Sequence, residues 1–360
     1  MERMCKRKSV FNLIMEAKIE VSDNKPRLSI GMPVYNGEKY IKNAIESILT
    51  QTYRDFELII SDNASTDWTQ KICLDYAKKD ARLHYYRNDK NLGGPNNYNR
   101  VFELSSGEYF KWAAYDDVLA PDFLKKCITV LDRDSSVVGC HCKTGRIDQH
   151  GQLLGYYNQG ILRHIGSSKP HERFRDLIGL GYTTTPFHGV YRTSFFAKSQ
   201  RHGSYVGADR NLVAELSLMG RIYEIPECLF FWREHPDSYT TIYYGSDSKN
   251  NLDRLQAEAK WWTKENATYF PHWKTCVEYF RSVNRISIKS SEQLLCYIQI
   301  LAWFIDEGRR FMAHDILLFM LIHSKVARKM IPYISLLRTF RRKIFSFSKK
   351  RSNKKNSDLA

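Results

Sequence analysis

The strongest constraint on the fold is an alternation that repeats between Arg27 and Lys143: a short apolar run, a polar turn and a segment of helical periodicity. This pattern is typical of a doubly wound α/β sheet. Between the first two runs, hydrophobic residues recur at helical spacing from Tyr40 to Leu49, which predicts a βαβ unit with parallel strands. The expected strands are Leu28–Val34, Phe56–Ser61, Leu83–Arg87, Tyr109–Ala113 and Val137–Lys143.

After Lys143 the pattern becomes looser, and Gly, His and Thr are more frequent up to about residue 245. One clear helix is expected in this segment, at Asp209–Met219. Two further strands are expected, at Ile222–Ile225 and Leu229–Trp232, and they would extend the sheet.

The last third of the chain is expected to be helical. It contains two apolar blocks, Leu294–Ile305 and Ile316–Ile322, both shorter than the roughly 20 residues that cross a bilayer. We therefore expect core or interfacial helices. The predicted division is an N-terminal extension at 1–26, an α/β domain at 27–245 with halves 27–143 and 144–245, a helical region at 246–345, and a basic tail at 346–360 that is expected to be disordered.

The formal net charge of +16 favours a polyanionic partner. Much of the excess lies at the two ends, in Lys6–Lys8 and Arg338–Lys355. A basic end beside apolar helices fits an anionic membrane surface, and no zinc-finger, helix-turn-helix or RNA-binding signature is present. We therefore expect a peripheral membrane role for the C-terminal region and no nucleic-acid partner. The alternative is that these helices pack on the α/β domain and the tail is solvated.

Cysteine usage and the N-terminal sequence both bear on the compartment. The eight cysteines show no C-x-x-C pair and no regular framework of the kind found in small secreted domains. They are interpreted as buried thiols in a reducing compartment. The first 30 residues are charged throughout and lack the apolar core of a secretory signal. We therefore expect a cytoplasmic protein.

A polar cluster follows each expected strand of the first half. In open α/β sheets, ligands bind beyond the carboxyl ends of the strands, where loops and helix N-termini converge. We therefore expect the clusters to line one cleft. They are Pro33–Glu38, Asp62, Asn91–Pro95 and Tyr115–Asp117.

Two adjacent acids, Asp116 and Asp117, follow the fourth expected strand. Neighbouring carboxylates repel each other unless a cation is present. A divalent cation with oxygen ligands, Mg²⁺ or Mn²⁺, bound by one or two carboxylates and by substrate phosphates, fits this position. The alternative is that one of the acids caps the next helix, although Asp122 is itself well placed for that role.

The second and third strand ends are less specific. Asp62 could accept the N–H of a uracil or guanine edge or a ribose hydroxyl, or it could form an Asx turn with Asn63 or Ser65. The pair Gly93 and Gly94 lacks the spacing of a phosphate loop or of a dinucleotide fingerprint, which argues against a kinase or a dehydrogenase.

In their order and spacing, five motifs together resemble the opening half of family 2 glycosyltransferases, which are inverting enzymes with the GT-A fold. The resemblance extends less closely through Gly207–Arg210 and Trp232–His235. The C-terminal third lies outside it. The five motifs are Ser29–Ile41, Ile60–Asp67, Asn91–Gly94, Gly107–Trp112 and Asp116–Asp122.

The resemblance implies a GT-A-like doubly wound mixed sheet and a metal-assisted transfer of a sugar, with inversion, from a nucleotide-diphosphate sugar to a glycan or lipid-linked hydroxyl acceptor. By resemblance, Asp209 is the catalytic base, and Asp116 and His235 are metal ligands for Mg²⁺ or Mn²⁺. The implied donor-nucleotide residues are Pro33, Tyr35, Glu38, Asp62, Asn91, Gly93 and Asp117.

One position departs from the family pattern. The acidic triplet usually begins with Asp, and here its first residue is Ala114, which puts the affinity for a cation in doubt. His235 could instead be an ordinary loop histidine, and Asp209 an ordinary helix cap. Two other functions therefore stay open: an inactive module that binds a sugar nucleotide or a glycan, and a metal-dependent nucleotidyltransferase.

Overall fold

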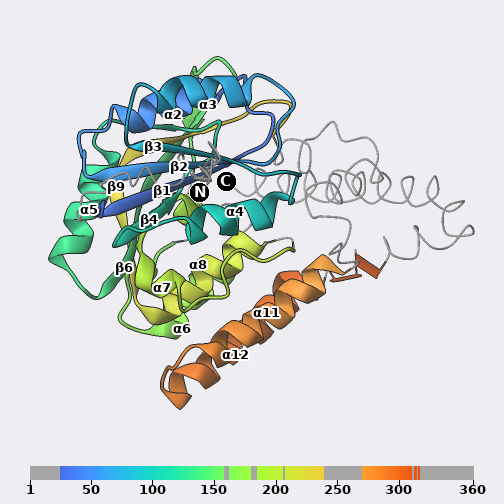
Figure 1. Cartoon of the computed structure of the whole chain (residues 1–360). Coiled ribbons are helices and arrows are strands. Elements are labelled where there is room, and N and C mark those ends of the chain that lie inside the picture. Colours follow the sequence, from blue (N-terminus) through green and yellow to red (C-terminus); the bar gives the residue numbers. More distant parts are fainter. Residues whose placement is uncertain are drawn as a thin grey trace, which may run out of the picture.

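A mixed β-sheet of nine strands forms the centre of the molecule in the part of the chain that the structure describes (Figure 1). The structure is a computed structural model, and it describes residues 25–157, 162–179, 185–205, 207–238, 270–309, 312–313 and 315–316. The strand order is β3-β2-β1-β4-β8-β6-β9-β5, and β7 pairs with β6.

The first half of the sheet is parallel, as the sequence predicts. Its strands β2, β1 and β4 lie side by side, with β3 outside β2. All seven residues of β1 are buried, because helices cover both faces of the sheet. The elements are β1 (Leu28–Val34), α2 (Ile41–Leu49), β2 (Phe56–Asp62), α3 (Thr69–Ala77), β3 (Leu83–Arg87), α4 (Gly94–Glu103) and β4 (Tyr109–Trp112).

The second half adds antiparallel strands and the helix expected near residue 209. β8 is antiparallel to both β4 and β6, and β9 runs parallel to β6. The elements are β5 (Val118–Leu119), α5 (Phe123–Arg133), β6 (Val137–Ile147), β7 (Leu153–Tyr156), α6 (Pro170–Ile178), the 3₁₀ turn η1 (Thr185–His188), β8 (Val190–Arg192), α7 (Thr193–Phe196), α8 (Ala208–Met219) and β9 (Arg221–Arg233).

The prediction of two strands at 222–225 and 229–232 is wrong, because both segments belong to the single strand β9. The pairing with β6 passes from Ile225 directly to Cys228, so Pro226 and Glu227 form a bulge. Proline cannot donate a hydrogen bond to the ladder, and a bulge is where a sheet tolerates it. The sequence pattern is interrupted there although the strand continues.

Two hydrophobic cores lie on opposite faces of the sheet. The first packs α2 and α5 against the sheet, and the second holds α4, α6 and α8. The second core also takes residues from α11 (Pro271–Arg285) and α12 (Ser290–Trp303), among them Tyr279 and Ile300, both fully buried. The two C-terminal helices run side by side along this face in Figure 1. They therefore share a core with the α/β domain.

Several expectations concern residues that the structure does not describe. These are residues 1–24 of the N-terminal extension, the basic tail, Cys5 and all but the first residue of the block at 316–322. Among the described cysteines, five are buried, two are half-buried, and none forms a disulfide. In the described residues, no helix combines the length and the apolar character needed to cross a membrane. The domain boundaries stay a prediction.

Candidate active site

The polar clusters after β1, β2 and β3 meet at the carboxyl edge of the parallel strands. The backbone N–H of Asn63 donates to the Val34 carbonyl at 2.8 Å, and the N–H of Asn36 donates to Ser65 Oγ at 2.9 Å. The Asn63 amide also donates to Asn91 Oδ1 at 2.8 Å. These bonds hold three loops together, so the expected cleft edge is a single structure.

Asp116 lies on the loop between β4 and β5, and its carboxylate is 14% exposed. Its Oδ2 atom lies 3.0 Å from Nε2 of His235, which follows β9. The two residues assigned to the metal by resemblance are thus in contact, although 119 positions separate them. The described residues contain no group of three or more His, Cys, Asp or Glu side chains that could hold a metal ion, so the protein contributes only this pair here.

The environment of His235 differs from that of an ordinary loop histidine. Its side chain is 1% exposed, and its ring packs on the Tyr40 ring with centroids 4.5 Å apart. Its Nδ1 atom is buried and has no hydrogen-bond partner among the described residues. Nε2 can bind a cation only if it carries no proton, and Nδ1 is available to hold that proton instead.

Asp117 faces the interior rather than the cleft. It is 6% exposed, and its Oδ1 accepts the backbone N–H of Arg233 at 2.9 Å. Burial and then the neighbouring Asp116 carboxylate raise the pKa of Asp117 well above its usual range. The Arg233 guanidinium donates to the Asp116 carbonyl at 2.7 Å, so it fixes the backbone of the acidic pair. Asp122 does occupy the N-cap of α5, but its carboxylate accepts the hydroxyl of Thr52.

Asp62, the last residue of β2, is fully buried, and both of its carboxylate oxygens accept hydrogen bonds. Its Oδ1 accepts the Ser65 N–H at 2.8 Å, which is the expected turn contact. Its Oδ2 accepts the Tyr85 hydroxyl at 2.6 Å and the Arg87 guanidinium at 2.8 Å. Contact between this carboxylate and a nucleotide therefore requires Arg87 or Tyr85 to move. Arg87 is about one third exposed.

The other expected donor residues lie on the interlocked loops. Tyr35 is 45% exposed, whereas Pro33 is buried at the end of β1. Glu38 accepts the N–H of Trp68 at 2.9 Å. Asn91 is exposed and accepts the N–H of Gly93 at 2.8 Å. Gly93 is the N-cap of α4 with φ of 81°, a left-handed conformation that favours glycine.

Asp209 lies in the first turn of α8, and its Oδ1 accepts the N–H of Arg210 at 2.8 Å. The N-cap of α8 is Gly207, with φ of 78°, so the interpretation of Asp209 as the helix cap is wrong. A carboxylate in this position lies at the positive end of the helix dipole.

Tyr98 on α4 connects the acids of the two halves. Burial raises the pKa of its phenol, and the negative charges of Asp116, Asp117 and Asp209 raise it further. Asp116 and Asp209 are thus both within electrostatic reach of one side chain. The Tyr98 ring stacks on His202 at 5.0 Å, on the segment that leads to α8.

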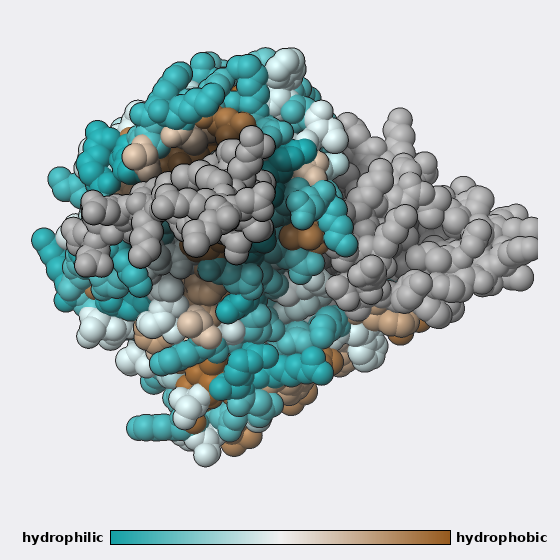
Figure 2. All heavy atoms as spheres, in the orientation of Figure 1, coloured by the Kyte–Doolittle hydropathy of each residue, from teal (hydrophilic) through white to brown (hydrophobic). Residues whose placement is uncertain are grey.

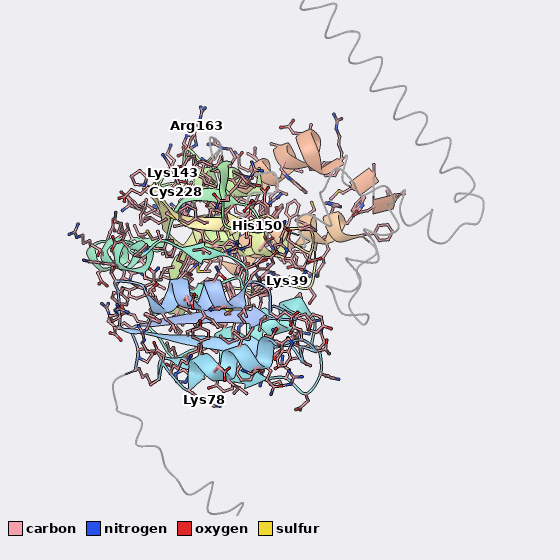
Figure 3. The ribbon with its side chains drawn as sticks, turned by 90° about the horizontal axis from the view of Figure 1, so that it is seen from above. Lys39, Lys78, Lys143, His150, Arg163 and Cys228 are labelled. Atoms are coloured by element: carbon pink, nitrogen blue, oxygen red, sulfur yellow. The ribbon has the colours of Figure 1, made fainter. Side chains whose placement is uncertain are left out.

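The opposite halves also meet through an exposed ion pair. Lys39, after β1, contacts Asp237, after β9, with Nζ and Oδ2 2.7 Å apart. Figure 3 shows Lys39 where the strands of the first half meet those of the second. Both side chains are more than 60% exposed, so the pair adds little stability.

Sequence reasoning missed three residues that shape the site: Arg87, Arg233 and Lys111. Lys111 on β4 is 1% exposed, and burial lowers its pKa to about 8. Its ammonium donates to the carbonyls of Trp112 and His188. Arg87 lies opposite Asp62 in the parallel register of β3 and β2, which the sequence does not reveal. No sequence feature singles out the other two.

The chain matches known glycosyltransferases. Residues 29–195 match the model of glycosyl transferase family 2. An uncharacterised glycosyltransferase of Rickettsia typhi is 35% identical over 130 residues, which are 36% of this chain and 40% of that protein. One of Haemophilus influenzae is 26% identical over 260 residues, 69% of this chain and 75% of that protein. The chain therefore aligns with less than half of the first relative and with most of the second.

The fold has a match among solved structures. The mannosyltransferase PcManGT from Pyrobaculum calidifontis, solved with GDP-Man and Mn²⁺, superposes with a TM-score of 0.50 at 14% identity, over 87% of this chain and 80% of that one. The mixed sheet with helices on both faces is thus a GT-A fold. The chain is therefore similar to glycosyltransferase family 2 in the sequence of residues 29–195 and to a GT-A glycosyltransferase in its fold.

Proposed function

We propose that the chain transfers a sugar from a nucleotide-diphosphate donor to a hydroxyl group of a glycan or lipid-linked acceptor, with inversion at the anomeric carbon. The contact between Asp116 and His235, at the sheet edge where the donor loops meet, is the observation that carries this proposal. The negative charges of Asp116 and Asp209 both act on Tyr98, so the two carboxylates lie near one side chain. The match to the family model, and the GDP-Man bound to PcManGT, whose fold is similar, support the assignment.

A divalent cation, Mg²⁺ or Mn²⁺, fits the donor set at Asp116 and His235. The pair offers one carboxylate and one imidazole, and a hard cation of this kind commonly takes its remaining ligands from substrate phosphates and water. His235 Nδ1 can hold the proton that Nε2 must release. When bound, the cation would offset the negative charge that develops on the departing nucleoside diphosphate. The solved relative in fold carries Mn²⁺.

Each residue of the site then has a separate role. Arg233 holds the Asp116 carbonyl and the Asp117 carboxylate, and the hydrogen bond between Asn63 and Asn91 holds together the loops after β2 and β3. Asp209 removes the proton from the acceptor hydroxyl as the oxygen attacks the anomeric carbon. Attack from the face opposite the leaving group inverts the configuration.

Product analysis tests this function against its alternatives. The purified chain is incubated with Mn²⁺, a panel of uridine, guanosine and thymidine diphospho-sugars, and candidate glycan acceptors. Release of nucleoside diphosphate supports glycosyl transfer. In a parallel incubation with a nucleoside triphosphate and a sugar 1-phosphate, release of pyrophosphate would instead identify a nucleotidyltransferase, and binding without turnover in either incubation would identify an inactive module.

A second part of the proposal concerns the partner of the C-terminal region, an anionic membrane surface. On α12 and the turn after it, Leu294, Ile298, Leu301 and Ile305 are between 48% and 61% exposed. Their spacing places them on one face, opposite the face that packs on α6 and α11. Figure 2 shows hydrophobic side chains along this edge of the molecule. In sequence, the helix is followed by the basic segment Arg338–Lys355, which matches anionic lipid in charge.

Sedimentation with vesicles tests the membrane contact. Binding to vesicles that contain phosphatidylserine should be strong at low salt and weaker at high salt, because basic residues contribute about 1 kcal/mol each near anionic lipid. Replacing Ile298 and Leu301 by Gln should weaken binding. The matched control replaces Leu153 and Leu154 on β7, which are 50% and 51% exposed, and should leave binding unchanged. Absence of salt-sensitive binding would rule this part out.

A further inference from the structure

A buried polar cluster joins α8 to α11. Glu215 on α8 is fully buried, and its Oε1 accepts the backbone N–H of Gln200 at 3.0 Å. Its Oε2 accepts the hydroxyl of Ser282 at 2.6 Å and a guanidinium N–H of Arg285, both on α11. All three of these hydrogen bonds to the Glu215 carboxylate therefore come from groups outside α8.

The cluster extends one turn toward the start of α8. Asn211 is fully buried, and its amide donates to the Tyr205 hydroxyl at 2.7 Å. The same hydroxyl accepts from the Gln200 side chain at 2.7 Å. Asn211 Oδ1 lies 3.2 Å from Ser282 Oγ, a weaker contact than the one between Ser282 and Glu215. We call these residues the α8–α11 cluster: Gln200, Tyr205, Asn211, Glu215, Ser282 and Arg285.

The cluster is close to Asp209 because part of it lies on the same helix, α8. Asp209 lies six residues before Glu215 on the same helix, about 9 Å along the helix axis. The α8–α11 cluster therefore fixes both α8 and the segment from Gln200 to Tyr205 that leads into it. The first turn also lies near α11, because the charge of Arg210 acts on the buried phenol of Tyr279, whose pKa burial raises to about 12.

We infer that the two C-terminal helices position the proposed base, with Glu215 and Arg285 as positioning residues that set the place of α8. This inference rests on the proposed function, because it assigns the role through Asp209. A displacement of about 1 Å at a reacting group can cost roughly a hundredfold in rate. The catalytic machinery thus extends past the region that the family model matches, residues 29–195.

The chemistry of the cluster favours positioning over stabilisation alone. A buried ion pair is a weak source of stability, since desolvation of both charges offsets their attraction. Apolar side chains of similar volume could fill the same space without the cost of desolvating two charges. A set of directed hydrogen bonds, in contrast, admits one arrangement of the two helices, because any slip leaves the Glu215 carboxylate without partners.

Variants at Arg285 separate the two roles. Arg285→Met removes the cation and keeps much of the apolar stem, and Arg285→Lys restores a cation. We expect kcat to fall at least tenfold in Arg285→Met with donor KM within about twofold of wild type, and to recover largely in Arg285→Lys. Glu215→Gln keeps the shape of the side chain and serves if Arg285→Met does not fold.

Glu292→Gln is the matched control. It removes the carboxylate that His171 contacts at 2.7 Å, which ties the same helical pair to α6 and not to α8. This variant should keep kcat near wild type in the folded fraction. An equal loss of kcat in Glu292→Gln and Arg285→Met would show that the helices only stabilise the fold.

Amide hydrogen exchange gives a readout that does not depend on turnover. In Arg285→Met, or in Glu215→Gln if that variant is used, the amides of residues 208–213 should exchange about tenfold faster than in wild type, while those of β1 stay unchanged. Unchanged exchange in α8 would overturn the inference. If the wild-type chain releases no nucleoside diphosphate, the proposed function fails, but this exchange result still decides whether the cluster holds α8.

Discussion

Replacing Asp209 by Asn tests the chemistry of the site most directly, because it removes a charge and keeps the shape of the side chain. Loss of a general base costs about 10²- to 10⁴-fold in rate, which corresponds to roughly 3 to 5 kcal/mol of barrier. The cost in folding stability should be much smaller. Asp209 is only partly buried in the first turn of α8, where a carboxylate contributes about 0.3 to 1 kcal/mol through the helix dipole.

The expected loss of rate is thus much larger, in free energy, than the expected loss of folding stability. We expect kcat to fall by at least a hundredfold while the melting temperature changes by a few degrees at most. Donor affinity, measured by calorimetry with a nucleoside diphosphate and Mn²⁺, should stay within a few-fold of wild type. The control is Glu172→Gln, which removes the acid in the first turn of α6 and should leave kcat unchanged.

Two results would refute the assignment of Asp209. If donor affinity collapses together with rate, Asp209 belongs to the donor site. If the rate changes less than about tenfold, another residue is the base. A loss of rate that merely follows a loss of folded protein would show in the melting curve of Asp209→Asn.

Three further predictions follow from the same structure. Asp116→Asn should lower turnover by several orders of magnitude with little change in stability, and EDTA should abolish wild-type activity; full activity in EDTA would contradict the metal proposal. Burial lowers the pKa of His188 to about 3, below its unfolded value of about 6.5. The unfolded chain therefore binds the extra proton first, so stability falls as pH drops from 6.5 to 4.5, and the fall should be smaller by about 2 kcal/mol in His188→Phe, measured by urea unfolding. Gly207→Ala should cost about 1 kcal/mol because φ is 78°, and an unchanged melting temperature would count against the left-handed cap.

The parallel half of the sheet could be predicted from the sequence, whereas in the other half the sequence indicated β6 and two segments of β9 but not β5, β7 or β8. Buried parallel strands such as β1 are continuous apolar runs, and the helices between them carry regular spacing. β5 and β8 have only two and three residues, too few for a period. Helix α4 begins with Gly, Pro and two Asn residues, a composition typical of turns, and its start is explained by Gly93 with positive φ before it and by the proline in its first turn.

The candidate site shows the same limit at the level of side chains. The strand-end rule located the loops, because carboxyl ends of parallel strands share an edge whatever their sequence. It could not indicate that Asp62 is closed off by Tyr85 and Arg87, since those bonds depend on the register of β2 and β3. Nor could it find the α8–α11 cluster, whose partners lie about 70 positions apart, as Glu215 and Ser282 show.

The distribution of charge at the sheet edge argues for a cation there, even though Ala114 replaces the first acid of the family's triplet. The chain as a whole carries +16, yet Asp116, Asp117 and Asp209 all act on Tyr98. Arg233 directs its guanidinium to the backbone carbonyls of residues 116, 148 and 149, and its charge only partly offsets the effect of burial on the pKa of Asp117. Lys111 also donates to carbonyls. In the described residues, Asp116 Oδ2 contacts the imidazole of His235 and no arginine or lysine, so this carboxylate would repel a nucleoside diphosphate unless a metal ion accompanied it.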